Sequence, residues 1–466
     1  MAAHNTLDLL VIGGGSGGLS ALDFGLALGA RCALIEKERI GGDCTWTGCV
    51  PSKSLLRVAR NAREVRSAAQ FGIIVGEPTV DMPGVRDYIQ HSVQTIAQAE
   101  TPEKMRERGI HTHIGAARFL DNKSIEVGGQ RLTAKKFIIA TGARPTIPDI
   151  PGLKEARYHT YETIFENDRL PQHLVVIGGG PIACEIGQAY HLLGARVTLI
   201  AQEGLLERHE PEVRDLLRDF FKRDGIAVLQ AKAECVATQD GCITVTTGDQ
   251  QITGDMLLVA VGRAPLVRGL DLESAGVEYT ADGITVNASL QTTATGIYAV
   301  GDCLGGPQFT HYAGWQAFHA VRSALLPGNS KGKATSPQTT FTMPEIAMTG
   351  LTEAAAREQH GDRVRAELWP MTKNDRGIVE RETAGFVKLV YKGATILGVT
   401  MVCPTAGDAI NEWTLAIHNG IKLADFAGAI HIYPTYSTAS QQIAAAVALK
   451  HFLESTVGKV ALRMRA

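Results

Sequence analysis

Long uncharged apolar runs are absent from this sequence. No such run reaches the ~20 residues needed to cross a bilayer, so we expect no membrane span. Cysteine is also scarce, and eight cysteines in 466 residues do not form the dense disulfide framework of small secreted proteins. No positively charged leader precedes the first apolar run. We therefore expect a cytoplasmic protein.

The sequence also lacks a large excess of either basic or acidic residues. The formal net charge of −2 gives no support to a nucleic-acid partner. A chain of 466 residues exceeds one ordinary hydrophobic core, so we expect two or three domains. Glycine, by contrast, is abundant: its 50 residues make up about 11% of the chain, where ~7% is usual. This favours a nucleotide-binding α/β architecture, because a backbone that approaches phosphate closely needs residues without a Cβ.

A glycine-rich loop follows the first apolar run. Residues 7–12 predict a strand, and Gly13, Gly15 and Gly18 then form a G-x-G-x-x-G pattern before a helical stretch. The helix amino terminus offers unpaired N–H groups to a pyrophosphate. The next apolar run predicts a second strand that ends at Glu36, where an acid accepts hydrogen bonds from a ribose. Together these features predict a βαβ dinucleotide-binding unit.

A second copy of this unit lies further along the chain. Residues 174–177 predict a strand, Gly178 and Gly180 belong to the following glycine loop, and the next helix carries Glu185. A strand at 197–200 completes the unit. Two dinucleotide sites in one chain imply two nucleotides, and we interpret them as a tightly held flavin and an exchangeable nicotinamide.

Two cysteines lie five residues apart just after the first unit. Residues 41–53 read GGDCTWTGCVPSK, with Cys44 and Cys49 between a glycine pair and a predicted turn at Pro51 to Lys53. The combination of this pair with two nucleotide sites indicates electron transfer from a flavin to a dithiol.

The motifs in this order resemble those of the class I flavoprotein disulfide oxidoreductases, in the branch that includes dihydrolipoamide dehydrogenases and mercuric reductases. Besides both glycine loops and residues 41–53, the resemblance includes residues 138–142 (IIATG) and 292–302 (TTATGIYAVGD). It extends over essentially the whole chain.

The resemblance implies an α/β fold with two Rossmann-like dinucleotide-binding domains and a C-terminal mixed α/β dimerisation domain. We expect an FAD-binding domain at 1–150 and again at 269–336, an NAD(P)H-binding domain at 151–268 and a dimerisation domain at 337–466. The implied assembly is a homodimer in which the partner's C-terminal domain completes the active site.

The resemblance also implies which residues bind the cofactors FAD and NAD(P)H. These residues are Gly13, Gly15, Gly18, Glu36, Gly42, Lys53, Thr141, Gly142, Gly178, Gly180, Gly262, Gly301 and Asp302. Asp302 is expected to contact ribityl or ribose hydroxyls. No resident metal site is expected.

A redox-active disulfide between Cys44 and Cys49 needs a distorted backbone. On an ideal helix, residues five apart are separated by ~7.5 Å along the axis and point ~140° apart, whereas a disulfide needs Cα atoms within roughly 4.4 to 6.8 Å. We expect Gly48 and Pro51 to permit the distortion. By analogy with the family, Cys49 faces the flavin and Cys44 meets the substrate.

Two charged residues are expected near the flavin and the nicotinamide. Lys53 lies one turn beyond Cys49, where its ammonium can stabilise negative charge, and Glu185 matches the family glutamate that pairs with this lysine. The strand at 197–200 runs into Ala201-Gln202-Glu203 and lacks the usual ribose-binding acid of NAD-dependent members. With Arg208 as a possible phosphate contact, the pattern favours NADPH.

The C-terminal third departs from the family pattern. A His-Pro-Thr motif, with a glutamate four residues after the proline, normally holds the substrate thiol's proton. Here tyrosine occupies the histidine position, Tyr433, and threonine replaces the glutamate, Thr438. A phenol with an ordinary pKa of ~10 is a poorer base at neutral pH than imidazole at ~6.5. His431 could substitute, because residues i and i+2 of an extended segment share a side, although they lie roughly 6.6 Å apart.

The sequence predicts a homodimeric FAD-dependent NAD(P)H oxidoreductase. Its candidate catalytic residues are Cys44, Cys49, Lys53, Glu185, Tyr433 and His431. The acceptor is expected to be a metal ion, a quinone or a disulfide, as in a mercuric reductase-like enzyme. Two alternatives stay open at this point: dihydrolipoamide dehydrogenase and a non-catalytic flavin-binding scaffold.

Overall fold

The structure is a computed structural model that describes residues 7–332 and 334–465. The chain forms two compact units. The first comprises Met1–Gly178, Leu192–Ala195 and Ala233–Ala334, and the second comprises Gly179–His191, Arg196–Lys232 and Thr335–Ala466. The four-part domain division expected from the sequence stays a prediction.

A seven-stranded sheet forms the centre of the first unit. Its order is β3-β2-β1-β6-β5-β4, with β18 also paired to β6. Strands β1, β2, β3, β6 and β18 pair in parallel, whereas β4 and β5 extend the sheet antiparallel. The bounds are β1 Leu7–Ile12, β2 Cys32–Glu36, β3 His111–Ile114, β4 Ala117–Asp121, β5 Ser124–Val127, β6 Gln130–Ile139 and β18 Ile297–Ala299.

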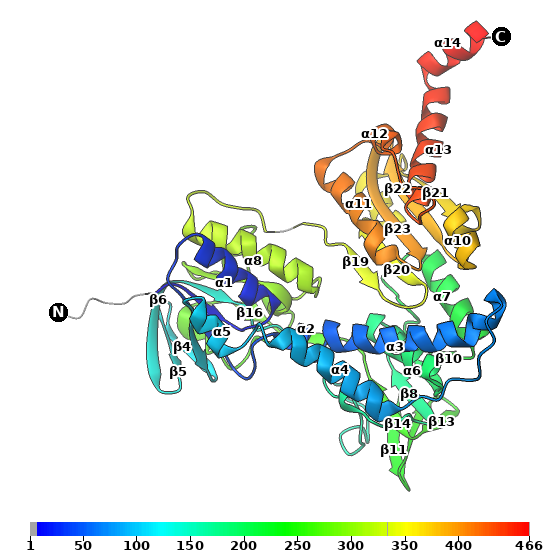
Figure 1. Ribbon diagram of the computed structural model, residues 1–466. Helices are drawn as coiled ribbons and strands as arrows, with labels where there is room; N and C mark the ends of the chain where they lie inside the picture. Colours follow the sequence, from blue (N-terminus) through cyan, green and yellow to red (C-terminus); the bar gives the residue numbers. More distant parts are fainter. Residues whose placement is uncertain (1–6, 333, 466) are drawn as a thin grey trace. The chain divides into compact units, whose positions relative to one another are not determined.

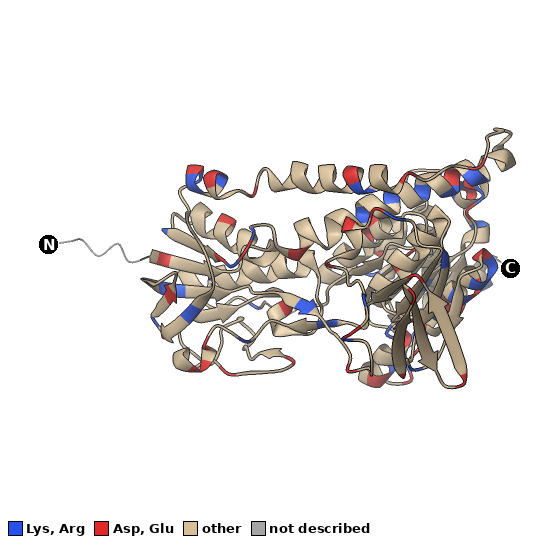
Figure 2. Ribbon diagram, turned by 90° about the horizontal axis from the view of Figure 1, so that it is seen from below, with Lys and Arg blue, Asp and Glu red and all other residues tan. Residues whose placement is uncertain are grey.

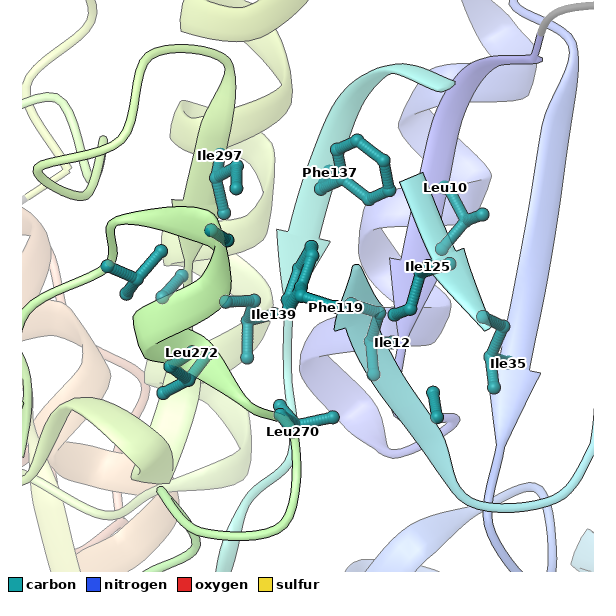
Figure 3. Packing of buried hydrophobic residues seen from close by; sticks show 14 of the residues in the cluster. Leu10, Ile12, Ile35, Phe119, Ile125, Phe137, Ile139, Leu270, Leu272 and Ile297 are labelled. Atoms are coloured by element: carbon teal, nitrogen blue, oxygen red, sulfur yellow. The ribbon is translucent and has the colours of Figure 1, made fainter. Parts of the chain in front are cut away.

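Parallel pairing of β1 with β2 and β6 buries both faces of the paired segments, so residues 9–12, 32–35 and 137–139 are all apolar and buried. Figure 3 shows side chains of one face converging from several strands and from the 3-10 helix Leu272–Ala275. The labelled residues are Leu10, Ile12, Ile35, Phe119, Ile125, Phe137, Ile139, Leu270, Leu272 and Ile297. This core fixes the carboxyl ends of β1, β6 and β18, where the candidate site residues follow.

Helices α1 (Ser16–Ala27) and α8 (Thr310–Leu325) lie side by side in the first unit (Figure 1). The other α-helices of this unit are α2 Gly42–Trp46, α3 Cys49–Ser67, α4 Met82–Ala97 and α5 Pro102–Glu107. Its smaller strand pairings are β8 (His173–Ile177) with β14 (Met256–Val259), β7 (Ala143–Pro145) with β15 (Arg263–Pro265), β16 (Tyr279–Thr280) with β17 (Gly283–Ile284), and the sheet of β11 Cys235–Gln239, β12 Cys242–Thr247 and β13 Gln250–Gly254.

A five-stranded antiparallel sheet dominates the second unit, in the order β19-β20-β23-β22-β21. Its bounds are β19 Gln338–Thr340, β20 Glu345–Gly350, β21 Arg365–Pro370, β22 Phe386–Lys392 and β23 Thr395–Cys403. Helix α11 (Ala406–Asn419) packs on β20 and β23 (Figure 1).

Parallel strands β9 (Arg196–Ile200) and β10 (Ala227–Leu229) also belong to the second unit. Its remaining α-helices are α7 Pro211–Asp224, α9 Glu353–His360, α10 Asp375–Glu380, α12 Leu423–Gly428, α13 Thr438–Glu454 and α14 Thr456–Arg465. Helix α6 (Pro181–Leu193) lies mostly in this unit. Across residues 7–332 and 334–465, no helix combines the length and apolarity that a membrane span requires.

Basic and acidic positions are interspersed along the ribbon (Figure 2). This distribution agrees with the near balance of 46 Lys and Arg against 48 Asp and Glu in the sequence.

Candidate active site

The first glycine loop connects β1 to α1, as predicted. Gly13 has φ +104°, and an added Cβ would lie 2.2 Å from the carbonyl oxygen of Ala140. At Gly18, an added Cβ would lie 1.9 Å from the carbonyl oxygen of Gly13. These close backbone approaches explain why only glycine fits at both positions. Helix α1 begins after Gly15, which supplies no capping side chain, and its described first turn holds no acidic residue.

Glu36 ends β2 beside this loop. Its Oε2 accepts a hydrogen bond from the backbone N–H of Gly14 at 2.7 Å, and its Oε1 accepts one from Glu38 at 2.8 Å. The carboxylate is therefore held at the tip of the loop, on the strand next to the uncapped helix. A ribose hydroxyl and a phosphate would find partners here, on Glu36 and on the N–H groups of α1.

The remaining residues predicted to bind the flavin surround this loop. Gly42 has φ +59°, and an added Cβ would lie 2.7 Å from the Cα of Gly15. Thr141 Oγ1 donates to the carbonyl oxygen of Leu266 at 2.7 Å. Positive φ angles occur at Gly142 (+75°), Gly262 (+142°) and Gly301 (+76°). Their geometry suits close backbone approach to a cofactor, and their individual binding roles stay predictions.

Cys44 and Cys49 are brought together by a break between two helices. Cys44 lies in α2, and Cys49 is the first residue of α3. A hydrogen bond between the two thiols, together with burial, raises the pKa of Cys44 far above its ordinary value.

Gly48 makes the break possible. It precedes α3 with φ −112° and ψ −107°, outside the helical region. An added Cβ would lie 2.7 Å from the carbonyl oxygen of Asp43 and 3.4 Å from the Cα of Cys44. The predicted distortion between the cysteines is thus confirmed, and its centre is Gly48.

The predicted turn at Pro51 to Lys53 is wrong. Residues 51–53 continue α3, which runs from Cys49 to Ser67. Pro51 is tolerated because it stands in the first turn, where the N–H that proline lacks would have no partner within the helix. Lys53 therefore lies one helical turn after Cys49, as expected, and its side chain is half-buried.

A cluster of charged side chains joins the cysteine segment to Asp302. Arg263 Nη2 lies 3.1 Å from Asp43 Oδ2 and 2.6 Å from Asp302 Oδ2. Tyr161 donates its hydroxyl to Asp43 at 3.1 Å. Burial raises the pKa of Asp302, and the Arg263 guanidinium only partly offsets that effect. Burial would lower the pKa of Arg263, but Asp302, Tyr161 and Asp43 hold it above the ordinary value.

These residues fit a bound flavin dinucleotide. Arg263 Nε is buried, and no hydrogen-bond acceptor for it exists among residues 7–332 and 334–465. Oxygens of a dinucleotide would satisfy this donor and the uncapped N–H groups of α1, while Glu36 and Asp302 would accept from hydroxyls.

The second glycine loop follows β8. Gly178 has φ +138°, and an added Cβ would lie 2.3 Å from the carbonyl oxygen of Ala260 within the first unit. Gly180 precedes α6, with open space around its Cα. Glu185 on α6 is buried, and its Oε1 accepts a hydrogen bond from Phe341 N at 2.9 Å within the second unit. Its predicted pairing with Lys53 stays a prediction.

Tyr433 and His431 have different partners. The Tyr433 hydroxyl donates to Asp375 Oδ2 at 2.9 Å, and the side chain is 69% exposed. This hydrogen bond raises the pKa of Tyr433. His431 Nε2 lies 3.0 Å from Glu412 Oε2, and its Nδ1 lies 3.0 Å from the carbonyl oxygen of Ala429.

Sequence reasoning missed several neighbours of these residues. They are Asp43, Tyr161, Arg263, Thr310, Asp375 and Glu412. Thr310 is the first residue of α8, the helix that begins eight residues after Asp302. The short distance in sequence between Thr310 and Asp302 was the one feature that could have indicated a position near the flavin.

The other cysteines divide into two groups. Cys32, Cys184, Cys303 and Cys403 are buried. Cys235 and Cys242 lie exposed on β11 and β12. Their strands form an outlying antiparallel sheet, so their side chains face solvent. Within the part of the chain that the structure describes, no three His, Cys, Asp or Glu side chains gather to hold a metal ion.

Comparison with known proteins agrees with this geometry. Residues 7–317 match the pyridine nucleotide-disulphide oxidoreductase family, and residues 336–444 match the dimerisation domain of that family. The dimerisation domain supports a homodimer. The family uses FAD and NAD(P)H, which identifies both cofactors of this chain.

Individual relatives extend over nearly the whole chain. A mercuric reductase from Staphylococcus aureus is 36% identical over 444 residues, which cover 92% of this chain and 80% of that protein. A dihydrolipoyl dehydrogenase from Thermus scotoductus is 34% identical over 462 residues, with 95% and 97% covered. Among solved structures, the Cu(II) complex of the HOCl-induced flavoprotein disulfide reductase RclA from Escherichia coli superposes with a TM-score of 0.85 at 26% identity, over 95% of this chain and 100% of that one.

The sequence matches cover the dithiol segment and both glycine loops, so the alternative of a non-catalytic scaffold is set aside. The protein is an FAD-dependent oxidoreductase that belongs to the pyridine nucleotide-disulphide oxidoreductase family.

Proposed function

We propose that this enzyme passes electrons from NAD(P)H through the Cys44–Cys49 dithiol to a soft metal ion. The observation that carries the proposal is the hydrogen bonding of Tyr433 and His431, which leaves neither residue suited to take a proton from a substrate thiol. The mercuric reductase relatives and the copper-bound structural neighbour agree with an acceptor of this class.

The dithiol performs the part of the reaction that the chain itself supplies. FAD, when bound, transfers two electrons between NAD(P)H and this pair. Opening the sulfur–sulfur bond takes up two electrons and one proton, leaving a Cys49 thiolate and a Cys44 thiol. Cys44 then loses its proton when both sulfurs bind a soft divalent cation. The two thiolates then re-form the sulfur–sulfur bond and give up two electrons, which reduce one mercuric ion to the metal or two cupric ions to cuprous ions.

Tyr433 is suited to donate a hydrogen bond but not to accept a proton. The hydrogen bond to Asp375 raises the pKa of Tyr433, so the phenol stays protonated at neutral pH. Reduction of a disulfide substrate needs a group that supplies and stores thiol protons. A cation needs none, because the metal itself displaces the remaining thiol proton.

His431 does not replace the missing family histidine in this proposal. Its side chain is 9% exposed, and both ring nitrogens face acceptor oxygens of its own subunit. Both ring nitrogens therefore have partners within the chain, and neither is left for a substrate thiol. We propose that His431 and Glu412 anchor the segment that carries Tyr433.

NADPH is the proposed coenzyme. Strand β9 ends at Ile200, and the residues that follow, Gln202 and Glu203, are exposed, as is Arg208. We also propose that Tyr433 is supplied to the active site by the partner subunit, and that Lys53 and Glu185 act near the flavin.

The proposed location of the enzyme is the cytoplasm. Cell fractionation tests the location.

Steady-state kinetics with a panel of acceptors test the function. The purified flavoprotein is assayed with NADPH and with NADH against mercuric and cupric salts, a quinone, oxidised lipoamide and oxidised glutathione. We expect the highest kcat/KM with a metal salt and with NADPH. A lipoamide rate that exceeds the metal rates and falls in His431→Gln would instead establish the dihydrolipoyl dehydrogenase alternative, to which the Thermus relative points.

A further inference from the structure

Asp43 is tied to two residues that lie far from it in the sequence. Its Oδ2 accepts hydrogen bonds from Arg263 Nη2 and from the Tyr161 hydroxyl, each at 3.1 Å. The same Arg263 nitrogen lies 2.6 Å from Asp302 Oδ2. One guanidinium nitrogen therefore joins the residue that precedes Cys44 to the carboxylate expected at the flavin. All of these residues belong to the first unit.

Helix α2, which carries Cys44, is too short to hold its position alone. It consists of the five residues Gly42–Trp46, and isolated helices of that length are unstable in water. Gly41 before it has φ +113°, and Gly48 after it has φ −112° and ψ −107°, so neither end continues as helical backbone. Side-chain contacts with other segments must therefore fix α2, and with it the outer cysteine.

Three side chains of α2 make contacts of this kind. Thr45 Oγ1 donates to the Glu100 carboxylate at 2.9 Å, and the Trp46 indole donates to the backbone just before α2 at 2.7 Å. The third contact is that of Asp43. Of the three, it is the one that reaches the charged cluster with Asp302, so it links the cysteine helix to the predicted flavin site.

The cluster around this third contact is shielded from water on most sides. The side chains of Arg263 and Asp302 are 19% and 14% exposed, and Tyr161 is buried. The guanidinium also lies over the Tyr161 ring, 5.4 Å from its centroid. A charge-assisted hydrogen bond in such surroundings is stronger and better directed than an exposed ion pair. Asp43 is therefore held in one place.

We propose that the hydrogen bond between Asp43 and Arg263 positions the outer cysteine, Cys44, against the inner one and thereby sets how readily their disulfide is reduced. Arg263 is a positioning residue here, because it acts on the sulfurs through Asp43. The inference rests on the proposed function, in which Cys44 and Cys49 are the redox pair. A high effective concentration of one thiol at the other stabilises their disulfide, so a loosely held α2 should make it easier to reduce.

The experiment compares two variants that remove the same charge. Asp43→Asn keeps an oxygen that accepts from Arg263, whereas Asp43→Ala does not, so the electrostatic effect of the lost carboxylate is matched. Each flavin-containing enzyme is equilibrated anaerobically with mixtures of reduced and oxidised dithiothreitol. After acid quenching, alkylation and mass spectrometry measure the reduced fraction of the Cys44–Cys49 pair. Flavin content checks that each variant is folded.

We expect the equilibrium constant for reduction of the pair to be about tenfold larger in Asp43→Ala than in Asp43→Asn, which is about 30 mV in reduction potential. In an Arg263→Met background the difference should fall below about threefold, because only the Tyr161 hydroxyl still holds the asparagine. Equal constants in the two Asp43 variants would overturn the proposal, as would a tenfold difference that persists without Arg263. The first comparison decides the matter even if Arg263→Met loses its flavin.

Failure of the proposed function gives a different result. If the parent enzyme forms no disulfide between the two cysteines in any mixture, the redox pair is refuted and the inference with it. If the two Asp43 variants differ as expected but metal salts are poor acceptors in the kinetic panel, the proposed acceptor alone is refuted.

Discussion

The dithiol segment of the first unit and the Tyr433 segment of the second differ in how closely they follow the family pattern. Around Cys44 and Cys49, the glycine break, the helix start and the following lysine all lie where an electron-transferring pair needs them. Around Tyr433, the family's histidine and glutamate are replaced, and the nearby His431 is engaged with Glu412 and Ala429. In the proposed function, the segment that stores electrons is retained and the segment that would handle substrate protons is changed.

The two units also use buried charge differently. In the first, Arg263 joins Asp43, the neighbour of Cys44, to Asp302. In the second, Lys388 is 5% exposed and contacts Glu210, Glu212 and Glu353 at 3.1, 2.8 and 3.0 Å. The first cluster lies next to the redox pair, whereas the second ties α7, α9 and β22 together within the second unit. The contrast predicts a chemical role for one cluster and a stabilising role for the other.

The largest expected effect is that of Cys49→Ser. Without the inner sulfur, electrons cannot enter the pair, so turnover with any metal acceptor should fall by at least roughly a thousandfold. The thiolate-to-flavin band should disappear. Cys242→Ser is the matched control, because Cys242 is exposed on β12 and should leave both properties unchanged. Retention of the band in Cys49→Ser would show that another sulfur faces the flavin.

Lys388→Met should lower the free energy of unfolding by about 3 kcal/mol, because it leaves the buried Glu210 carboxylate without its counter-charge. Chemical denaturation of the flavin-containing enzyme measures the change. Lys450→Met is the control: Lys450 pairs with Glu367 at 2.9 Å, but both side chains are exposed, so the loss should stay below about 1 kcal/mol. Equal losses in both variants would contradict the assignment of a buried, stabilising cluster.

The effect of Lys388→Met should depend on pH. Hydrogen bonds from Arg357 and Lys388 lower the pKa of Glu353 below 4.5, so its contribution is present above that value and is lost as the pH falls through the lowered folded pKa. Burial lowers the pKa of Lys388, but Glu212, Glu353 and Glu210 raise it above 10.5 overall, so its contribution is lost only at still higher pH. The difference between wild type and variant should therefore be largest from about pH 5 to pH 10 and shrink in acid.

Tyr433→Phe tests whether the hydroxyl of Tyr433 contributes to reduction of the acceptor. If the hydroxyl assists a metal acceptor by donating a hydrogen bond, its removal should lower kcat/KM about tenfold with the metal salt. The reduction of flavin by NADPH, followed by stopped flow, should not change. Slower flavin reduction would contradict this prediction, because it would show that Tyr433 acts in the transfer from NADPH to the flavin and not in the reduction of the acceptor.

The smallest effect is expected for His431→Gln. Glutamine can still donate to Glu412, so the segment should keep its position, and metal reduction should change by less than about threefold. A loss as large as that of Cys49→Ser would show that His431 handles protons after all.

The sequence predicted the parts of the fold that short patterns determine. Glycine spacing and apolar runs fixed β1, α1 and β2, because the tight approach of Gly13 and Gly18 to neighbouring backbone allows no other residue. The turn predicted at Pro51 was wrong because the first turn of a helix tolerates proline.

Contacts between distant residues could not be predicted in this way. Thr310 and Cys49 are 261 residues apart, and Arg263 and Asp43 are 220 apart. No local sequence pattern predicts contacts between residues so far apart. These contacts depend on how β6 and β18 align in the sheet and on where the chain then places β15 and α8. The partner of Tyr433, Asp375, was missed for the same reason.

Anaerobic half-reduction tests the central claim most directly. One equivalent of NADPH is added to the oxidised flavoprotein, the long-wavelength thiolate-to-flavin band is recorded, and one acceptor is then mixed in. The account predicts that the band appears and is discharged by a mercuric or cupric salt far faster than by oxidised lipoamide or glutathione. A band that never forms, or one that a disulfide discharges faster than either metal salt, would contradict it.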